Sequence, residues 1–118
     1  MESNNDKMLA IDPLHPKCMS EVLELLRNKP AMYLGRKSLH DLRSWLDGFQ
    51  YAIFINDGTA LKMDVDLSAF DTFIQDHYDW HDVGGWSAKI MYYNRIDTEA
   101  FDEFFKLYDE FRLINSKE

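Results

Sequence analysis

The stretch KPAMYLGRKSLHDL, residues 29–42, decides how this chain is divided into helices. Pro30 disfavours a helical conformation at the residue before it and so ends the helix that precedes it. Gly35 can adopt the positive φ of a tight turn, and Ser38 is a favoured N-cap for the next helix. We therefore expect an architectural corner between two helices, with the apolar residues 32–34 packed into the core. The alternative is that the tyrosine among them is an exposed contact.

Apolar residues at helical spacing lie on both sides of this corner. Residues 20–28 (SEVLELLRN) predict a short amphipathic helix with two glutamates in its first turn, where the helix dipole favours negative charge. After Ser38, Asp41 holds the position of a capping-box acid. The seam of the following helix, which ends at the turn of residues 56–58, consists of Leu39, Leu42, Leu46, Phe49 and Ile53. Because a glycine inside a helix costs about 1 kcal/mol, Gly48 predicts that another helix crosses closely there.

A third helix is predicted after residue 67, with Ser68 as its cap. Its apolar face is expected to hold Phe70, Phe73, Ile74, His77 and Tyr78. On the same helical wheel, Asp71, Asp76 and Asp79 fall on the opposite, solvent-facing side.

The last third of the chain contains one ambiguous segment and one clear helix. Residues 86–94 (WSAKIMYYN) fit either a short helix capped by Ser87 or a strand around residues 88–93, and the helix is favoured. Asp97 is expected to cap the final helix. The aromatic stripe of that helix, which is typical of a protein core, consists of Phe101, Phe104, Phe105, Tyr108 and Phe111.

Together these elements predict a mainly α protein of four to five helices. A loose N-terminal lead-in over residues 1–16 is expected to precede a single compact helical domain over residues 17–118. No run of apolar residues is long enough to cross a membrane, and the N-terminus lacks the pattern of a secretory signal. Cys18 is the only cysteine, which excludes an internal disulfide and suits a reducing compartment. We therefore expect a cytoplasmic protein.

Sequence patterns for catalysis and for cofactor binding are weak. The five glycines form no phosphate-binding loop, and residues 64–75 lack the glycine and the glutamate of a calcium loop. His77 and His81, at i and i+4, are expected to share a helix face, with Asp79 and Asp82 as possible oxygen ligands. The glutamate of a zinc-protease helix is absent. We therefore predict that the protein is not an enzyme and needs no cofactor, and a small metal-binding enzyme is the least favoured alternative.

The acidic charge is concentrated in the second half of the chain. The net charge is −8, and residues 57–118 carry fourteen Asp and Glu against six Lys and Arg. Such charge disfavours nucleic acid and membrane as direct partners and attracts basic protein surfaces, although solubility alone is a simpler explanation. Carboxylates on one face can imitate a nucleic-acid backbone, and aromatic residues favour interface hot spots. The predicted partner-binding residues are Asp64, Asp66, Asp71, Asp76, Tyr78, Asp79, Trp80 and Asp82.

Several segments resemble one family of small bacterial proteins. The pattern Pro30-Ala31-Met32-Tyr33-Leu34-Gly35, followed by Ser38-Leu39, is similar to that of immunity proteins of polymorphic toxin systems, especially contact-dependent growth inhibition. Gly85-Trp86 and the aromatic helix of residues 100–111 extend the resemblance. It covers residues 20–111, and the acidic middle matches least.

The resemblance implies a cytoplasmic protein that binds and neutralises the C-terminal domain of one cognate toxin. The acidic charge favours a basic toxin, and a nuclease (RNase or DNase) in particular. The resemblance assigns no toxin-contact residue. An acidic adaptor or regulator without a toxin partner is the alternative.

Overall fold

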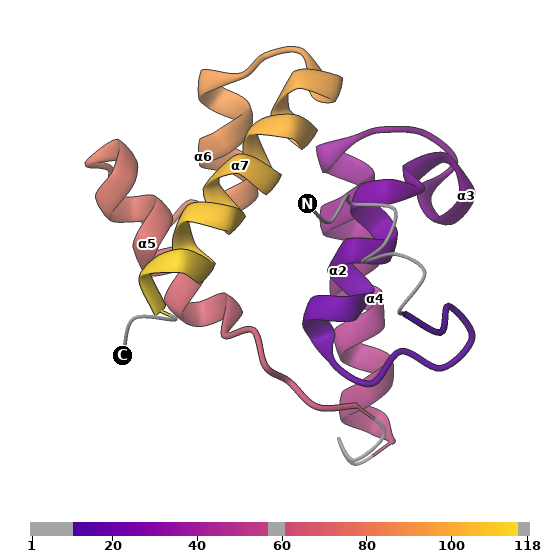
Figure 1. Cartoon of the computed structure of the whole chain (residues 1–118). Coiled ribbons are helices and arrows are strands. Elements are labelled where there is room, and N and C mark those ends of the chain that lie inside the picture. The colour runs from indigo at the N-terminus through magenta and orange to yellow at the C-terminus, as the bar shows by residue number, and fades with distance from the viewer. Residues whose placement is uncertain (1–10, 57–60, 116–118) are drawn as a thin grey trace.

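The computed structural model describes residues 11–56 and 61–115, and the following statements concern these two ranges. Their helices are α2 (Met19–Asn28), α3 (Pro30–Leu34), α4 (Leu39–Ile55), α5 (Leu67–Tyr78), α6 (Trp86–Tyr93) and α7 (Asp97–Asn115). Figure 1 shows α2, α3 and α4 on one side of the molecule and α5, α6 and α7 on the other. The prediction of a mainly α fold is confirmed. The helices of the described ranges exceed the expected four to five because the corner before α4 is itself a short helix.

The corner between α2 and α4 has the predicted backbone but not all of the predicted packing. Pro30 is the first residue of α3, and Gly35 ends it with a φ of 84°. Tyr33 and Leu34 are half-buried against the core, whereas Met32 is 69% exposed. The expectation that all three pack inward was wrong, because three consecutive helical residues span about 200° and cannot all share one face.

The core is centred on an aromatic side chain of α5. Phe70 is fully buried, and its ring lies 5.4–5.5 Å from the rings of Trp86, Phe104 and Phe111. These edge-to-face contacts join α5 to α6 and α7 and add to the hydrophobic burial. The aromatic stripe of α7 is buried along its whole length, which confirms its assignment to the core.

Two details of the helical faces differ from expectation. Gly48 has no atom within 4 Å of the position that a Cβ would occupy, so the predicted close crossing of another helix was wrong. Of the predicted seam of α4, Leu39, Leu42 and Leu46 are buried, and Phe49 and Ile53 are partly buried against the core. His77 is exposed rather than placed on the apolar face of α5.

Aspartates cap two helix N-termini, one of them from a distant segment. Asp66 is the N-cap of α5, and its carboxylate accepts hydrogen bonds from the backbone N–H groups of Ser68 and the next residue at 3.0 Å. Asp64 accepts from the backbone N–H (2.9 Å) and the hydroxyl (2.6 Å) of Ser20, in the first turn of α2. The predicted cap at Ser68 was therefore wrong. So was the cap at Ser87, because α6 begins after Gly85.

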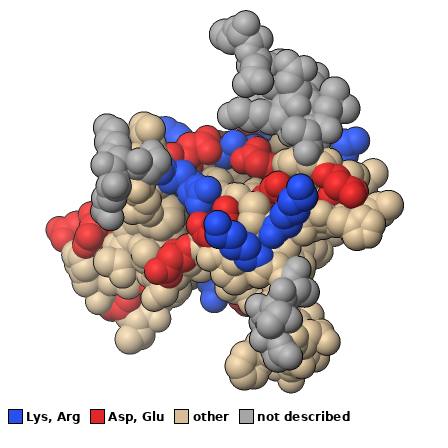
Figure 2. All heavy atoms as spheres, turned by 60° about the horizontal axis from the view of Figure 1, so that its bottom comes forward, with Lys and Arg blue, Asp and Glu red and all other residues tan. Residues whose placement is uncertain are grey.

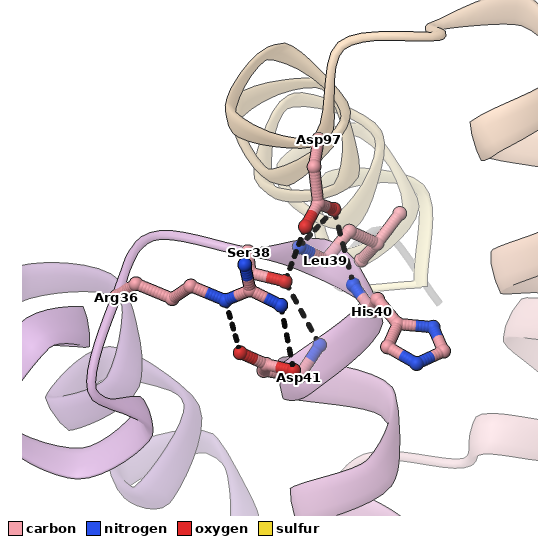
Figure 3. Close-up of polar contacts among 6 residues, drawn as sticks. All are labelled: Arg36, Ser38, Leu39, His40, Asp41 and Asp97. Carbon is pink, nitrogen blue, oxygen red and sulfur yellow. Dashed lines mark hydrogen bonds and ion pairs between the residues drawn. The ribbon is translucent and has the colours of Figure 1, made fainter.

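A third aspartate joins α7 to α4 (Figure 3). The carboxylate of Asp97 accepts hydrogen bonds from the backbone N–H groups of Leu39 (2.9 Å) and His40 (3.2 Å) and from the hydroxyl of the buried Ser38. Ser38 caps α4 as predicted, since its Oγ accepts from the N–H of Asp41 at 3.0 Å. Asp97 itself is the first residue of α7, and its side chain caps α4 instead of its own helix.

The Asp41 carboxylate takes no part in a capping box. It accepts from the guanidinium of Arg36, with 2.6 Å between Nε and Oδ2 (Figure 3). This pair is exposed, and its hydrogen bond holds the pKa of Asp41 below its usual value. The Arg36 pair therefore replaces the reciprocal bond that the spacing to Ser38 predicts.

We expect the folded protein to lose stability between about pH 10 and pH 12. Burial raises the pKa of Tyr108 from 10.0 to about 12, so the neutral phenol is favoured in the folded state. The stability that this contributes is fully present below pH 10 and disappears as the pH approaches 12. A pKa that rises by about two on folding contributes about 3 kcal/mol to the free energy of unfolding. Urea unfolding between pH 9 and pH 12 measures this loss.

In the Tyr108→Phe variant, most of the loss of stability between pH 10 and pH 12 should disappear. Part of it should remain, because burial also raises the pKa of Tyr78. The control Tyr51→Phe, at an exposed position on α4, should keep the full decline. An equally steep decline in Tyr108→Phe would refute the assignment.

Candidate functional site

Five of the eight predicted partner-binding residues gather at the C-terminal end of α5. Asp76 and Tyr78 lie in its last turn, and Asp79, Trp80 and Asp82 lie in the loop that follows. These residues come from one continuous stretch of chain. The local grouping that the sequence indicates is therefore present in the folded protein.

The other three predicted residues lie elsewhere and have structural partners. Asp64 and Asp66 cap helices near the opposite end of α5, roughly 18 Å away at 1.5 Å per residue. Asp71 is half-buried, and its Oδ2 accepts from the amide of Gln75 at 3.1 Å. Its Oδ1 is buried without a hydrogen-bond partner among the described residues. The prediction that Asp71 faces solvent was wrong.

Two tyrosines of α6 complete an aromatic cluster that the sequence did not indicate. The ring of Tyr93 stacks on Tyr78 with 4.4 Å between centroids, and Tyr92 meets the edge of Trp80 at 5.1 Å. Tyr92 and Tyr93 are 58% and 53% exposed. We call this site the aromatic–acidic surface and define it by Asp76, Tyr78, Asp79, Trp80, Asp82, Tyr92 and Tyr93.

One pattern in the sequence could have drawn attention to Tyr92 and Tyr93, which the sequence analysis did not single out. Once residues 86–94 are taken as a helix, Trp86 and Ile90 share its buried face at i and i+4. Tyr93, at i+7 from Trp86, continues that face, whereas Tyr92 lies about 100° to one side of it. Their neighbours remain unknown until α6 is placed against α5, so the pairing with Tyr78 and Trp80 required the structure.

The carboxylates of the surface are exposed to solvent. The side chain of Asp79 is 96% exposed, and that of Asp82 is 64% exposed. Hydrogen bonds from the Trp80 side chain and from the backbone N–H of Gly84 hold the pKa of Asp82 below its usual value. Three exposed carboxylates thus lie on the same stretch of chain as Tyr78 and Trp80, an arrangement suited to a partner that presents Lys or Arg.

The two histidines do not share a helix. α5 ends at Tyr78, and Asp79 takes a left-handed conformation, so His81 lies in the loop. The Nε2 of His81 lies 3.0 Å from Asp76 Oδ1, while the His77 ring meets the Tyr78 ring edge-to-face with 4.6 Å between centroids. Within residues 11–56 and 61–115, no group of three or more His, Cys, Asp or Glu is arranged to hold a metal ion.

Acidic side chains elsewhere are mixed with basic ones. Figure 2 brings forward the bottom of the molecule in Figure 1, and there Asp and Glu alternate with Lys and Arg across the centre of the face. Arg27 pairs with Asp109 at 2.6 Å, and Lys37 pairs with Asp102 at 2.7 Å. The negative charge of the sequence therefore does not spread over one uniform acidic face.

A shallow groove between α2, α3 and α7 offers a weaker alternative site. It has a volume of about 790 Å³ and is lined by paired charges of both signs around Phe101 and Phe105. Arg27 lies over the ring of Phe105 at 4.6 Å and donates to the carbonyl oxygen of the same residue. Arg27 pairs with Asp109 and Lys37 pairs with Asp102, so these four groups offer a ligand little unpaired charge.

Comparison with protein-family models, with curated proteins and with solved structures finds no match to this chain. In the described part of the chain, no helix has both the length and the apolar character needed to cross a bilayer.

Proposed function

We propose that this chain is an immunity protein that binds and neutralises a cognate toxin domain through the aromatic–acidic surface. The observation that carries the proposal is the exposed pair Tyr92 and Tyr93, which contacts Tyr78 and Trp80. The segment that holds Tyr78 and Trp80 also carries the exposed carboxylates Asp76, Asp79 and Asp82. Large rigid aromatic side chains supply most of the energy at protein interfaces. The toxin part of the proposal is supported by the resemblance of residues 30–39 and 100–111 to bacterial immunity proteins.

The chemistry of the surface favours a basic partner. Asp76, Asp79 and Asp82 can occupy positions that phosphates hold in a nuclease, and their charge steers association toward about 10⁸ M⁻¹s⁻¹ at low salt. The proposed toxin is therefore a basic RNase or DNase domain. In this proposal the chain binds neither nucleic acid nor membrane, uses no catalysis and acts in the cytoplasm.

A protection assay tests the proposal. The C-terminal domain encoded immediately upstream is induced in bacterial cells with and without this protein. Growth that continues only when the protein is present supports immunity. A toxic domain that the protein does not counteract contradicts it and favours the adaptor, which would bind several basic proteins weakly instead of one tightly.

We expect Asp79→Gly to stabilise the protein while weakening toxin binding. Asp79 ends α5 at a φ of 50°, where glycine is the preferred residue, so the change should raise the free energy of unfolding by roughly 0.5–1 kcal/mol. Loss of the exposed carboxylate should slow association several-fold and flatten its salt dependence. Urea unfolding and surface plasmon resonance at two salt concentrations measure the two effects.

Two further variants separate the effect of the carboxylate charge from the effect of the backbone conformation at residue 79. Asp79→Asn keeps a side chain that tolerates the left-handed conformation, so its stability should stay near that of the wild type while association slows as in Asp79→Gly. Asp47→Asn removes one exposed charge from α4, outside the surface, and should affect association less. Equal association rates for all three variants and the wild type would exclude Asp79 from the interface.

A further inference from the structure

Lys89 of α6 is fully buried, with no exposed surface on its side chain. Lysine is almost never buried to this extent unless its ammonium group has partners, because removing the charge from water is costly. An apolar residue would fill the same position on α6 without that cost. The charge therefore calls for an explanation beyond core packing.

All the described partners of the ammonium group belong to one loop. Nζ donates hydrogen bonds to the backbone carbonyl oxygens of Asp82 (3.1 Å) and Gly84. It also lies 3.9 Å from the carboxylate of Asp82 and 5.6 Å from the ring centroid of Trp80. Residues 80–84 thus wrap around a single buried cation that satisfies their inward-facing carbonyl groups.

The same loop carries two residues of the aromatic–acidic surface. Its start is held by the bond from the backbone N–H of Trp80 to the carbonyl oxygen of Gln75 at 2.9 Å. Its end lies beside Arg43 of α4, whose guanidinium would be 3.1 Å from a Cβ at Gly85. Between these points the Asp82 carboxylate accepts hydrogen bonds from the Trp80 side chain and from the backbone N–H of Gly84 (3.3 Å). The ammonium group of Lys89 adds the bonds to the two carbonyl groups that face inward.

We propose that Lys89 is a positioning residue for partner binding. Its ammonium group holds the loop in the conformation that presents Trp80 and Asp82, so the loop does not have to be ordered when the partner binds. Preorganisation of this kind raises affinity by removing an entropic cost of association. This inference rests on the proposed function, because the partner is the toxin domain that the surface binds.

The variant Lys89→Met tests the inference. Methionine keeps the length and apolar character of the side chain but cannot support the two carbonyl groups. The helical signal in circular dichroism should persist, while ¹⁵N relaxation of residues 81–85 should show rapid motion in the free protein. Affinity for the toxin domain should fall about tenfold. Lys106→Met, which removes an exposed lysine from α7, should change neither the loop nor the affinity.

A measurement on the wild type covers the case in which Lys89→Met does not fold. The backbone order parameters of residues 81–85 should match those of the adjoining helices, and values below about 0.6 would overturn the inference. A loop that stays ordered in folded Lys89→Met would also overturn it. Because neither readout uses the toxin, a failed protection assay overturns the proposed function without deciding the role of Lys89 in the loop.

Discussion

Replacing both Tyr92 and Tyr93 with alanine is expected to weaken binding of the toxin domain by about 100-fold or more. Central aromatic residues of an interface cost about 2 kcal/mol or more when truncated, and each 1.4 kcal/mol is tenfold in affinity. The two rings touch, with 5.0 Å between centroids, so their effects should not add fully. Titration calorimetry with the purified toxin domain measures the loss.

A control variant shows whether the loss of affinity is specific to the interface or follows from removing any exposed tyrosine. Tyr51 of α4 is 66% exposed, slightly more than either tyrosine of α6, and lies outside the aromatic–acidic surface. Tyr51→Ala should therefore leave affinity within about twofold of the wild type. Urea unfolding should show that the double variant loses only a modest part of its stability, since both rings are more than half exposed. Binding within about threefold of the wild type by the double variant would place the interface elsewhere.

Replacing Asp97 with alanine is expected to lower the free energy of unfolding by about 3 kcal/mol. Loss of a helix cap costs 0.5–2 kcal/mol, and a buried hydroxyl or N–H left without its acceptor costs about 1–3 kcal/mol. Both losses occur here, because Asp97 accepts from Leu39, His40 and the buried Ser38. Urea unfolding at pH 7, followed by circular dichroism, measures the change.

Two other variants define the cause of that loss. Asp97→Asn keeps one carbonyl oxygen for the backbone N–H groups and should recover part of the stability. Asp102→Ala removes another carboxylate of α7, whose pair with Lys37 is exposed, and should cost at most about 1 kcal/mol. If Asp97→Ala were no more destabilised than Asp102→Ala, the contact between α7 and α4 would not be a stabilising cap.

Local sequence patterns predicted the helices well. Apolar residues at spacings of three and four placed α4, α5 and α7, and the predicted positive φ at Gly35 and the cap at Ser38 are both present. These features depend on interactions within one or two helical turns, so the chain specifies them without its tertiary neighbours.

Helix capping was less predictable because an unpaired backbone N–H can donate a hydrogen bond to any carboxylate that reaches it. The sequence assigned caps to Ser68 and Asp97 on their own helices, whereas Asp66 caps α5 and Asp97 caps α4. Asp64 likewise serves the first turn of α2, 44 residues away in sequence. Much of what was interpreted as a binding charge is thus used inside the fold, where it complements helix dipoles.

The sequence by itself determined that this protein is helical, has an aromatic core and carries an acidic stretch with Trp80 near its end. Only the tertiary structure decided which carboxylates remain available, that Tyr92 and Tyr93 join Tyr78 and Trp80, and that Lys89 lies buried beneath the loop. The physical reason is the range of the interactions. Helical periodicity arises between residues a few positions apart, whereas a surface is formed by side chains from different helices and depends on how those helices pack.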